Sequence, residues 1–112
     1  MSPTRLGGAV KEVVVEQYLA RRCRAEKGWA LKLVPVSWAG LPDRLVLLSL
    51  GRMGFLELKR PGEKPSGRQT WWIGELRRLG YQAGWTDSKA GVDAFLDCLH
   101  GFDPHPQGHR YG

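Results

Sequence analysis

The stretch from Gly40 to Lys59 constrains the fold of this chain more than any other. It holds two apolar runs separated by glycines, the pattern of two β-strands joined by a turn. In the second run, which starts at Phe55, alternate side chains point to opposite faces, so Glu57 and Lys59 share one face. Burying a carboxylate and an ammonium on an apolar strand is costly unless each has a partner or a function. The hairpin therefore indicates a polar site built on a sheet.

Asp43, at the head of the first strand, offers a second carboxylate to the same corner. Carboxylates are the hard oxygen ligands that Mg²⁺ takes, and a nearby lysine can activate water and offset phosphate charge. This set predicts phosphodiester hydrolysis with Asp43 and Glu57 as metal ligands and the backbone carbonyl of Leu58 as a third ligand. Lys59 is expected to activate water or to stabilise the developing charge.

The position of the turn decides whether the two carboxylates can meet. A turn centred on residues 51–54 would leave Asp43 about five residues out of step with Glu57, roughly 16 Å at ~3.3 Å per residue. A turn centred near residues 49–52 brings them within about one residue of each other and places Gly54 inside the second strand. Because a one-residue slip would put Asp43 on the wrong face, we expect the earlier turn together with a bulge or irregular residue after Pro42.

The string G-L-P-D-R at 40–44, followed by E-L-K-R at 57–60 and by Gln69 at the opening of a helix, resembles the PD-(D/E)xK nuclease signature. In its longer form it is similar to the virus-type replication-repair nuclease (VRR-NUC) domain, over residues 11–99. The resemblance implies a restriction-endonuclease-like fold and a DNA endonuclease that uses Mg²⁺ or Mn²⁺. It also implies a branched or four-way junction substrate, a homodimer and the cytoplasm of a bacterial or phage-infected cell.

Two further site residues follow from the resemblance. A glutamate of the first helix completes the acidic site in this family, and the string V-E-Q-Y-L places Glu16 at that position. Glu12 remains the alternative, and both could instead be solvated partners of nearby basic residues. Gln69 either only closes a capping box with Ser66 or also points its amide into the site, and the family pattern favours the second role.

The periodicity of apolar residues predicts the order helix, three strands, helix, strand, helix, which is a mixed β-sheet flanked by helices. The first helix is expected over residues 9–25, with Val10, Val13, Val14 and Tyr18 as its core-facing stripe. Domain boundaries are expected as a flexible leader over 1–8, the nuclease-like domain over 9–100 and a flexible tail over 101–112.

The remaining elements are expected as strands over 29–34 and 81–86 and helices over 66–79 and 89–99. The inward residues of these two helices are expected to be Trp72, Ile73, Leu76 and Leu79, and then Val92, Phe95, Leu96 and Leu99. The three histidines lie at or beyond the end of the last helix, so none is expected to act as a general base in the core.

The chain carries a net charge of +6, which suits a nucleic-acid partner and is informative because it accompanies an acidic cluster. Candidate DNA contacts are Lys32, Trp38, Arg44, Arg60, Lys64 and Arg68. Lys32 could instead be an edge lysine, and Trp38 could be a hydrophobic lid rather than a stacking surface. The competing interpretation of the whole chain is a non-catalytic basic DNA-binding module, which would have no reason to keep Asp43, Glu57 and Lys59 together.

Other sequence features bear on compartment and assembly. No run approaches the roughly 18 apolar residues of a membrane span, and the two cysteines, Cys23 and Cys98, show no ligand spacing and fit a reducing compartment. Trp71 lies beside Trp72 on one helix and is expected to point outward. Such an exposed aromatic suits a dimer anchor, to which Trp85 could add, although Trp71 could also pack under the turn at 60–65.

Overall fold

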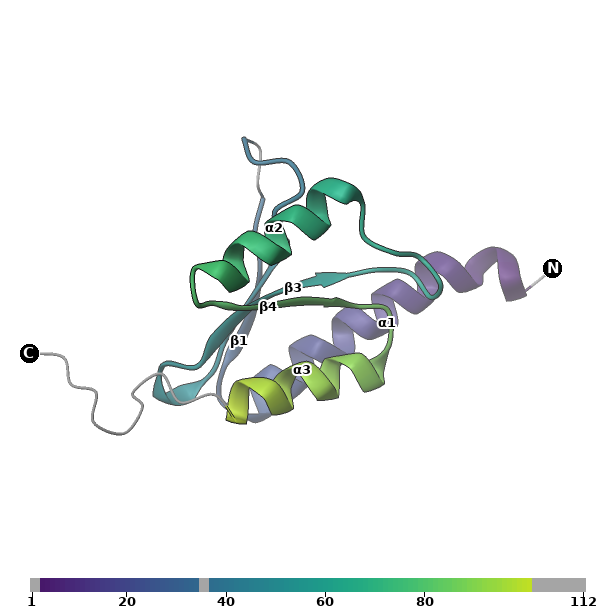
Figure 1. Cartoon of the computed structure of the whole chain (residues 1–112). Helices are drawn as coiled ribbons and strands as arrows, with labels where there is room; N and C mark the ends of the chain where they lie inside the picture. The colour runs from purple at the N-terminus through teal and green to yellow at the C-terminus, as the bar shows by residue number, and fades with distance from the viewer. Residues whose placement is uncertain (1–2, 35–36, 102–112) are drawn as a thin grey trace, which may run out of the picture.

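The computed structural model describes residues 3–34 and 37–101, with side chains from residue 12 onward. The element order matches the sequence-based prediction (Figure 1). In chain order the elements are α1 (Pro3–Ala25), β1 (Trp29–Lys32), β2 (Arg44–Leu47), the short 3₁₀ turn η1 (Ser49–Gly51), β3 (Met53–Leu58), α2 (Gly67–Arg78), β4 (Gln82–Thr86) and α3 (Lys89–Gly101).

The four strands form one mixed sheet in the order β1-β2-β3-β4. β1 pairs antiparallel with β2 and β2 pairs antiparallel with β3, whereas β4 adds parallel to β3 after the crossover through α2. The hairpin between β2 and β3 turns at Ser49–Gly51, and Leu48 N–H donates to the Arg52 carbonyl at 2.8 Å to close it. Of the two expected turns the earlier one is therefore confirmed, with Gly54 inside β3.

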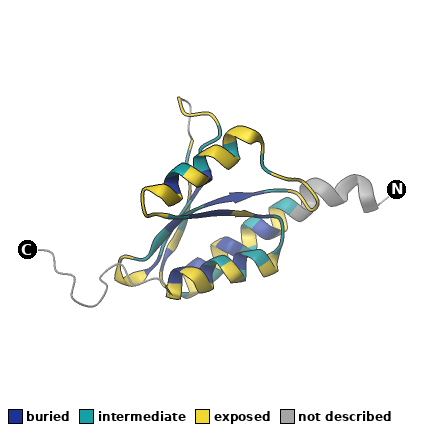
Figure 2. Cartoon of the chain, in the orientation of Figure 1, coloured by how far each residue is buried: buried dark blue, intermediate teal, exposed yellow. Residues whose placement is uncertain are grey.

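The main core lies between the sheet and the pair α1 and α3, which cover the same face (Figures 1 and 2). Gly54 belongs to this face, because Phe95 and Leu99 of α3 occupy the space that a side chain there would need. The buried members of this core are Val15, Leu19, Cys23, Val46, Leu48, Leu56, Leu58, Val92, Leu96 and Leu99.

Of the described elements, α2 covers the opposite face of the sheet, which carries a much smaller core. Its buried members are Ile73, Leu76 and Ala83, with Leu41 and Phe55 packed at its edge. The helix begins with the predicted capping box, in which Ser66 Oγ accepts from Gln69 N–H and Gln69 Oε1 accepts from Ser66 N–H. α2 is therefore fixed at its first turn by its own sequence and along its length by few apolar contacts.

The first helix differs from its prediction in two ways. It begins at Pro3 rather than near residue 9, so residues 3–8 belong to a helix and not to a loose leader; proline suits a first helical position because its missing N–H is not needed there. Its core-facing residues are Val15, Leu19 and Cys23, whereas Val13 is 47% exposed. The prediction was wrong for Val13 and Val14, because valines at 13–15 fit two neighbouring stripes equally well and packing against the sheet selected the later one. Tyr18 packs half-buried against this core as predicted, and the side chain of Val10 lies outside the described ones.

Smaller differences concern element ends. β1 ends at Lys32 and β4 begins at Gln82, each shorter than expected, and α3 continues to Gly101. Leu79, expected to face inward, is the exposed C-cap of α2. His105 and His109 lie outside the described residues, and no helix among the described segments is long and apolar enough to cross a membrane.

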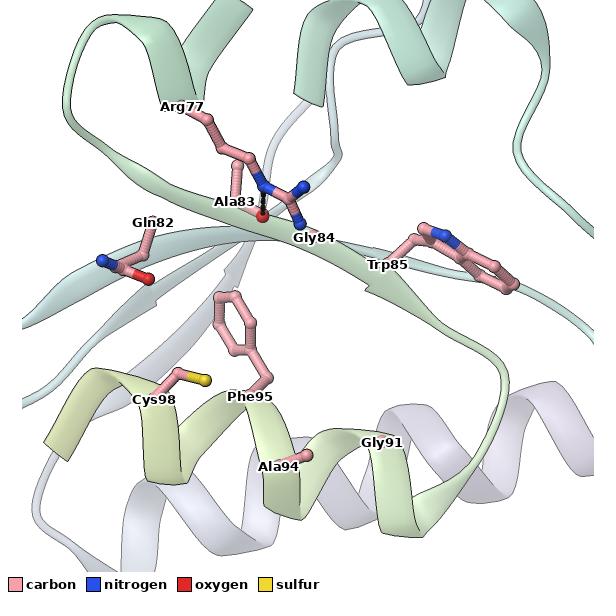
Figure 3. A pocket seen from close by; sticks show the side chains of 9 residues that line it. All are labelled: Arg77, Gln82, Ala83, Gly84, Trp85, Gly91, Ala94, Phe95 and Cys98. Carbon is pink, nitrogen blue, oxygen red and sulfur yellow. Dashed lines mark hydrogen bonds between the residues drawn. The ribbon is translucent and has the colours of Figure 1, made fainter. Parts of the chain in front are cut away.

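β4 is an edge strand, and α2 shields part of that edge. Arg77 Nε donates to the carbonyl oxygen of Ala83 at 2.8 Å, as Figure 3 shows. Below this contact the side chains of Phe95 and Cys98 from α3 line the same hollow. An edge carbonyl that is already bonded is a poor template for an added strand, so Arg77 protects the sheet against edge-to-edge pairing.

Candidate active site

Asp43 and Glu57 meet at one corner of the sheet. β2 pairs with β3 so that Arg44 opposes Leu56, and continuing this register by one residue places Asp43 opposite Glu57. Residues directly opposite each other in antiparallel strands share a face. Asp43 N–H donates to Glu57 Oε1 at 3.3 Å, which ties the two residues together. The register itself aligns them, so the bulge that we expected after Pro42 is not required for that alignment.

The approach to this corner is rigid. Pro42 is fully buried, and Gly40 has a φ of +90° that disfavours other residues. A side chain at Gly40 would also collide with Arg68, the second residue of α2. The string G-L-P-D is thus needed to bring the chain close against α2 and then into β2 at the right register.

Glu57 is 8% exposed, and its carboxylate is surrounded by polar partners. Gln69 Nε2 donates to Glu57 Oε2 at 3.2 Å, and Lys59 Nζ lies 4.0 Å from the same oxygen. Burial raises the pKa of Glu57 above its ordinary value and the charge of Asp43 raises it further, while Lys59 opposes the shift. The site is therefore an acidic pair in which burial and the neighbouring carboxylate both disfavour the charged form of Glu57.

Gln69 performs both of the roles that were considered for it. Its Oε1 completes the capping box by accepting from Ser66 N–H at 2.9 Å, and this bond aims its Nε2 at Glu57. The start of α2 therefore orients the amide, and the amide orients the carboxylate. Asp43, Glu57, Lys59 and Gln69 come from the loop before β2, from β3 and its end, and from α2.

Comparisons with known proteins identify the family to which the chain belongs. No family model matches the chain. A curated protein of Acyrthosiphon pisum secondary endosymbiont phage 1, "Putative nuclease p44", is 39% identical over 80 residues, which are 71% of this chain and 86% of that protein. A solved structure described as "VRR_NUC domain" superimposes with a TM-score of 0.71 at 31% identity, covering 78% of this chain and 95% of that one. The chain belongs to the VRR-NUC family.

The glutamates of the first helix lie apart from the acidic pair in this VRR-NUC domain. Glu16 forms an ion pair with Arg44, which is 7% exposed and faces α1. Glu12 Oε1 lies 3.6 Å from Arg60 Nε. Among the described residues no ion pair or hydrogen bond joins either glutamate to Asp43 or Glu57.

The predicted DNA contacts divide into exposed and buried residues. Arg44 was expected to contact DNA but is buried, because the alternation of β2 turns it toward α1, where it pairs with Glu16. Lys32 lines a small cleft of about 230 Å³ with Glu16 and Arg44 on that same face. The other four side chains are exposed on the loop before β2, on the turn after β3 and on α2: Trp38, Arg60, Lys64 and Arg68.

The acidic pair fits a divalent cation in its chemistry, although within the described residues no group of three or more His, Cys, Asp or Glu side chains forms a metal cluster. Glu57 is buried beside the charge of Asp43, and this charge disfavours its ionised form. A cation held by both carboxylates would remove that repulsion, and oxygen ligands suit Mg²⁺ or Mn²⁺. Asp43 and Glu57 are therefore the residues that would hold it, with the Leu58 carbonyl as the expected further ligand.

The structure also brings together three tryptophans that the sequence analysis considered separately. Trp38, Trp71 and Trp72 form one edge-to-face series, with ring centroids 6.1 Å apart between Trp38 and Trp72 and 5.1 Å apart between Trp71 and Trp72. Trp71 does not pack under the turn at 60–65; it is 59% exposed. A possible signal was the spacing from Arg68 to the pair W-W, which places all three on the first turns of one helix.

Proposed function

We propose that this VRR-NUC domain is a DNA endonuclease that hydrolyses phosphodiester bonds with Mg²⁺ or Mn²⁺ and prefers branched or four-way junction DNA. The observation that carries the proposal is the convergence of two carboxylates, a lysine and an amide on one corner, from three separate segments. A structural role alone does not account for this set, since a buried carboxylate with a raised pKa reduces stability.

In the proposed mechanism Asp43 and Glu57 hold the cation, which when bound polarises the scissile phosphate and lowers the pKa of the attacking water. Lys59 Nζ lies 4.0 Å from Glu57 Oε2, where its ammonium would orient the attacking water and stabilise the negative charge that develops on the phosphate. Gln69 keeps Glu57 in position through its 3.2 Å hydrogen bond. Glu16 contributes by fixing Arg44 behind the strand, and it completes the acidic site only if that ion pair opens.

The surface around the corner supports DNA as the substrate. Arg60, Lys64 and Arg68 are exposed on the turn and the helix that follow Lys59, whereas Lys32 is exposed on β1 but on the α1 side of the sheet with Arg44. Lysine and arginine neutralise backbone phosphates, and the first three lie on segments next to an acidic pair that would otherwise repel DNA. Arg44 is left out of this set because it is buried.

The homodimer belongs to the same proposal. A two-fold pair of sites would face opposed strands, which suits a symmetric four-way junction. Trp85 is 40% exposed on the edge strand β4 and is a candidate anchor of the dimer interface, as is the exposed Trp71. Sedimentation at micromolar concentration tests this assembly: a monomer at every concentration would exclude the dimer and favour cutting one strand at a time.

The cellular compartment of the protein is a further part of the proposal. Cys23 and Cys98 are both free, Cys23 buried and Cys98 exposed. Free thiols suit a reducing compartment, and we therefore place the protein in the cytoplasm of a bacterial or phage-infected cell.

A cleavage assay with four DNA substrates decides the function. Junction, flap, single-stranded and linear duplex DNA of matched sequence are incubated with Mg²⁺, with Mn²⁺ and with a chelator. The proposal expects cleavage only with metal, and fastest on the junction. Binding without cleavage under every condition would instead support the non-catalytic DNA-binding module, and equal cleavage of all four substrates would remove junction selectivity.

A further inference from the structure

A slot lined by three tryptophans opens next to the acidic corner. Its lining residues are Ser37, Trp38, Ala39, Arg68, Trp71 and Trp72, and its volume is about 670 Å³; we name it the tryptophan slot. The Trp72 ring is half-buried, and the rings of Trp38 and Trp71 each stand nearly perpendicular to it, at 84° and 83°. We call the two exposed rings, Trp38 and Trp71, the walls of the slot.

The walls of the tryptophan slot present an unusual amount of aromatic surface. Trp38 is 62% exposed and Trp71 is 59% exposed. Large aromatic groups left open to solvent commonly mark a binding site. The ring of Trp38 is held in place by Trp72 and by the close contact of its loop with α2, where Gly40 packs against Arg68. The exposure is thus a feature of a fixed surface.

The tryptophan slot shares its supporting segments with the catalytic corner. Arg68 directly precedes Gln69, the residue that hydrogen-bonds Glu57, and Trp72 lies one helical turn further along the same side of α2. At 1.5 Å of rise per residue, Trp72 is about 4.5 Å from Gln69 along the helix axis. Consecutive bases of a DNA strand are about 3.4 Å apart. The slot and the amide that contacts Glu57 are therefore on adjacent turns of one helix, so that one DNA strand could reach both.

We infer that the tryptophan slot binds one unpaired nucleobase next to the scissile phosphate, with Arg68 on an adjacent backbone phosphate. Any base offers a π-face to a tryptophan wall, so this contact selects for an unstacked base and not for a sequence. Arg68 supplies the charge complementarity that an apolar ligand would not need. The slot gives the proposed nuclease its preference for junctions and flaps, where bases are unpaired, over linear duplex, where every base is stacked. This inference rests on the proposed function for its link to cleavage.

A second copy of the chain is the alternative binding partner of Trp71. The slot arrangement favours the base, because Trp71 shares one cavity with Arg68, and a positive charge at the centre of a like-charged dimer interface is unfavourable. Changing Trp71 separates the two occupants, since only the dimer makes the oligomeric state depend on this ring.

The test measures binding without chemistry. Short duplexes that carry one 2-aminopurine, either unpaired or paired, are titrated with protein in the presence of chelator. The fluorescence of the 2-aminopurine is recorded for both probes. We expect quenching by the native protein on the unpaired probe only. Trp38→Ala and Trp71→Ala should each weaken binding of the unpaired probe by about tenfold while changing duplex affinity by less than about twofold.

Two controls keep the result specific. Trp29→Ala removes another exposed tryptophan, which lies on β1 under Arg24, and it should leave both affinities unchanged. Trp38→Phe and Trp71→Phe keep an aromatic face and should recover most of the binding. Equal losses on both probes, or a loss with Trp29→Ala, would overturn the slot as a base site. A Trp71→Ala protein that changes from dimer to monomer, with base binding intact, would assign the ring to a second copy.

The experiment also separates this inference from the proposed function. If the native protein quenches the unpaired probe but cleaves no substrate, the slot stands and the nuclease proposal fails. If it cleaves junctions while the Trp38→Ala and Trp71→Ala proteins keep full junction preference, the nuclease proposal stands and the slot fails.

Discussion

The two faces of the sheet solve different problems. Among the described residues, the face under α1 and α3 buries ten apolar side chains and one charged side chain, Arg44, which is paired with Glu16. On the same count the face under α2 buries three, and beside them it holds Glu57 among Asp43, Lys59 and Gln69. Stability is concentrated on the first face, which lets the second face keep a polar and partly open corner.

The difference shows how one strand can serve both purposes. Along β3 the residues Leu56 and Leu58 point into the large core, and Glu57 between them points to the α2 side. Each buried leucine contributes about 1.5–3 kcal/mol by leaving water. Two such residues flank Glu57 and offset the cost of keeping it there. The comparison predicts that changes on the two faces will have separable effects on stability and on activity.

The largest effect is expected from Glu57 and Lys59. Glu57→Ala and Lys59→Ala should each lower the rate of junction cleavage by about 10²–10⁴-fold, because they remove a metal ligand and a charge-stabilising group. Thermal unfolding should change little for Lys59→Ala and could rise for Glu57→Ala, since a disfavoured buried charge is lost. DNA affinity should be kept or increased in Glu57→Ala as repulsion of phosphate falls.

Two residues of matched charge outside the acidic corner, half-buried Glu75 and exposed Lys89, serve as controls for that experiment. Glu75→Ala on α2 and Lys89→Ala at the start of α3 should retain cleavage. Full activity in Lys59→Ala would remove the lysine from the mechanism, and full activity in Glu57→Ala would remove the acidic pair.

The next effect separates the two faces by stability. Leu96 lies fully buried in the large core and Leu76 in the small one, and both are leucines of a helix that covers the sheet. Leu96→Ala should cost about 4 kcal/mol of unfolding free energy and Leu76→Ala about 2 kcal/mol, at opposite ends of the usual range for such changes. Chemical denaturation measures both.

The same two variants should reverse their order in activity. At a temperature where both are folded, Leu76→Ala should lose more cleavage, because it loosens the helix that holds Gln69 against Glu57. Similar losses of stability and of activity in both variants would show that the faces are not independent.

Much of the fold was predictable because the apolar alternation and the glycines fix a hairpin in only a few ways. The element order, the earlier turn and Gly54 inside β3 are all confirmed. The capping box of Ser66 and Gln69 was also predicted, since it depends only on local sequence. Local rules of this kind reach as far as the order of elements, the position of a hairpin turn and the start of a capped helix.

The failures have a different origin. The stripe of α1 was misassigned because the valines at 13–15 fit two stripes and only packing against the sheet decides between them. Arg44 was assigned to DNA from its charge, but its direction depends on the register of β2. The tryptophan slot joins a loop residue, Trp38, to α2 across a long sequence separation, and no periodicity reports such a contact.

A smaller effect should distinguish the two glutamates of α1. Glu16→Gln weakens the partner of buried Arg44 and should cost about 1–3 kcal/mol. Glu12→Gln breaks an exposed pair with Arg60 and should cost less than about 1 kcal/mol. We expect the first to lose cleavage as well and the second to keep it. If only Glu12→Gln loses activity, Glu12 and not Glu16 completes the acidic site.

The smallest effect concerns metal binding and its pH dependence. Mg²⁺ at ten times its dissociation constant should add about 1.4 kcal/mol to the unfolding free energy, a rise of several degrees in melting temperature for a domain of this size. The matched control is Glu57→Gln, which lacks the charge and should show no such rise. An equal rise in that variant would place the bound ion elsewhere.

The pH dependence of that rise tests the electrostatics of the corner. The pKa of Glu57 is raised in the folded protein, so folding favours its protonated form, and the cost of the buried charge appears as pH increases through the folded pKa. Metal binds the ionised form only, and stabilisation by Mg²⁺ should therefore be full near pH 8 and disappear on acidification. Its loss should begin above the pH at which an ordinary glutamate, with a pKa of about 4.3, takes up its proton. A Mg²⁺ effect that persists unchanged to pH 4 would show that Glu57 is not the ligand, and the α2 face would then hold its charged corner for DNA contact alone.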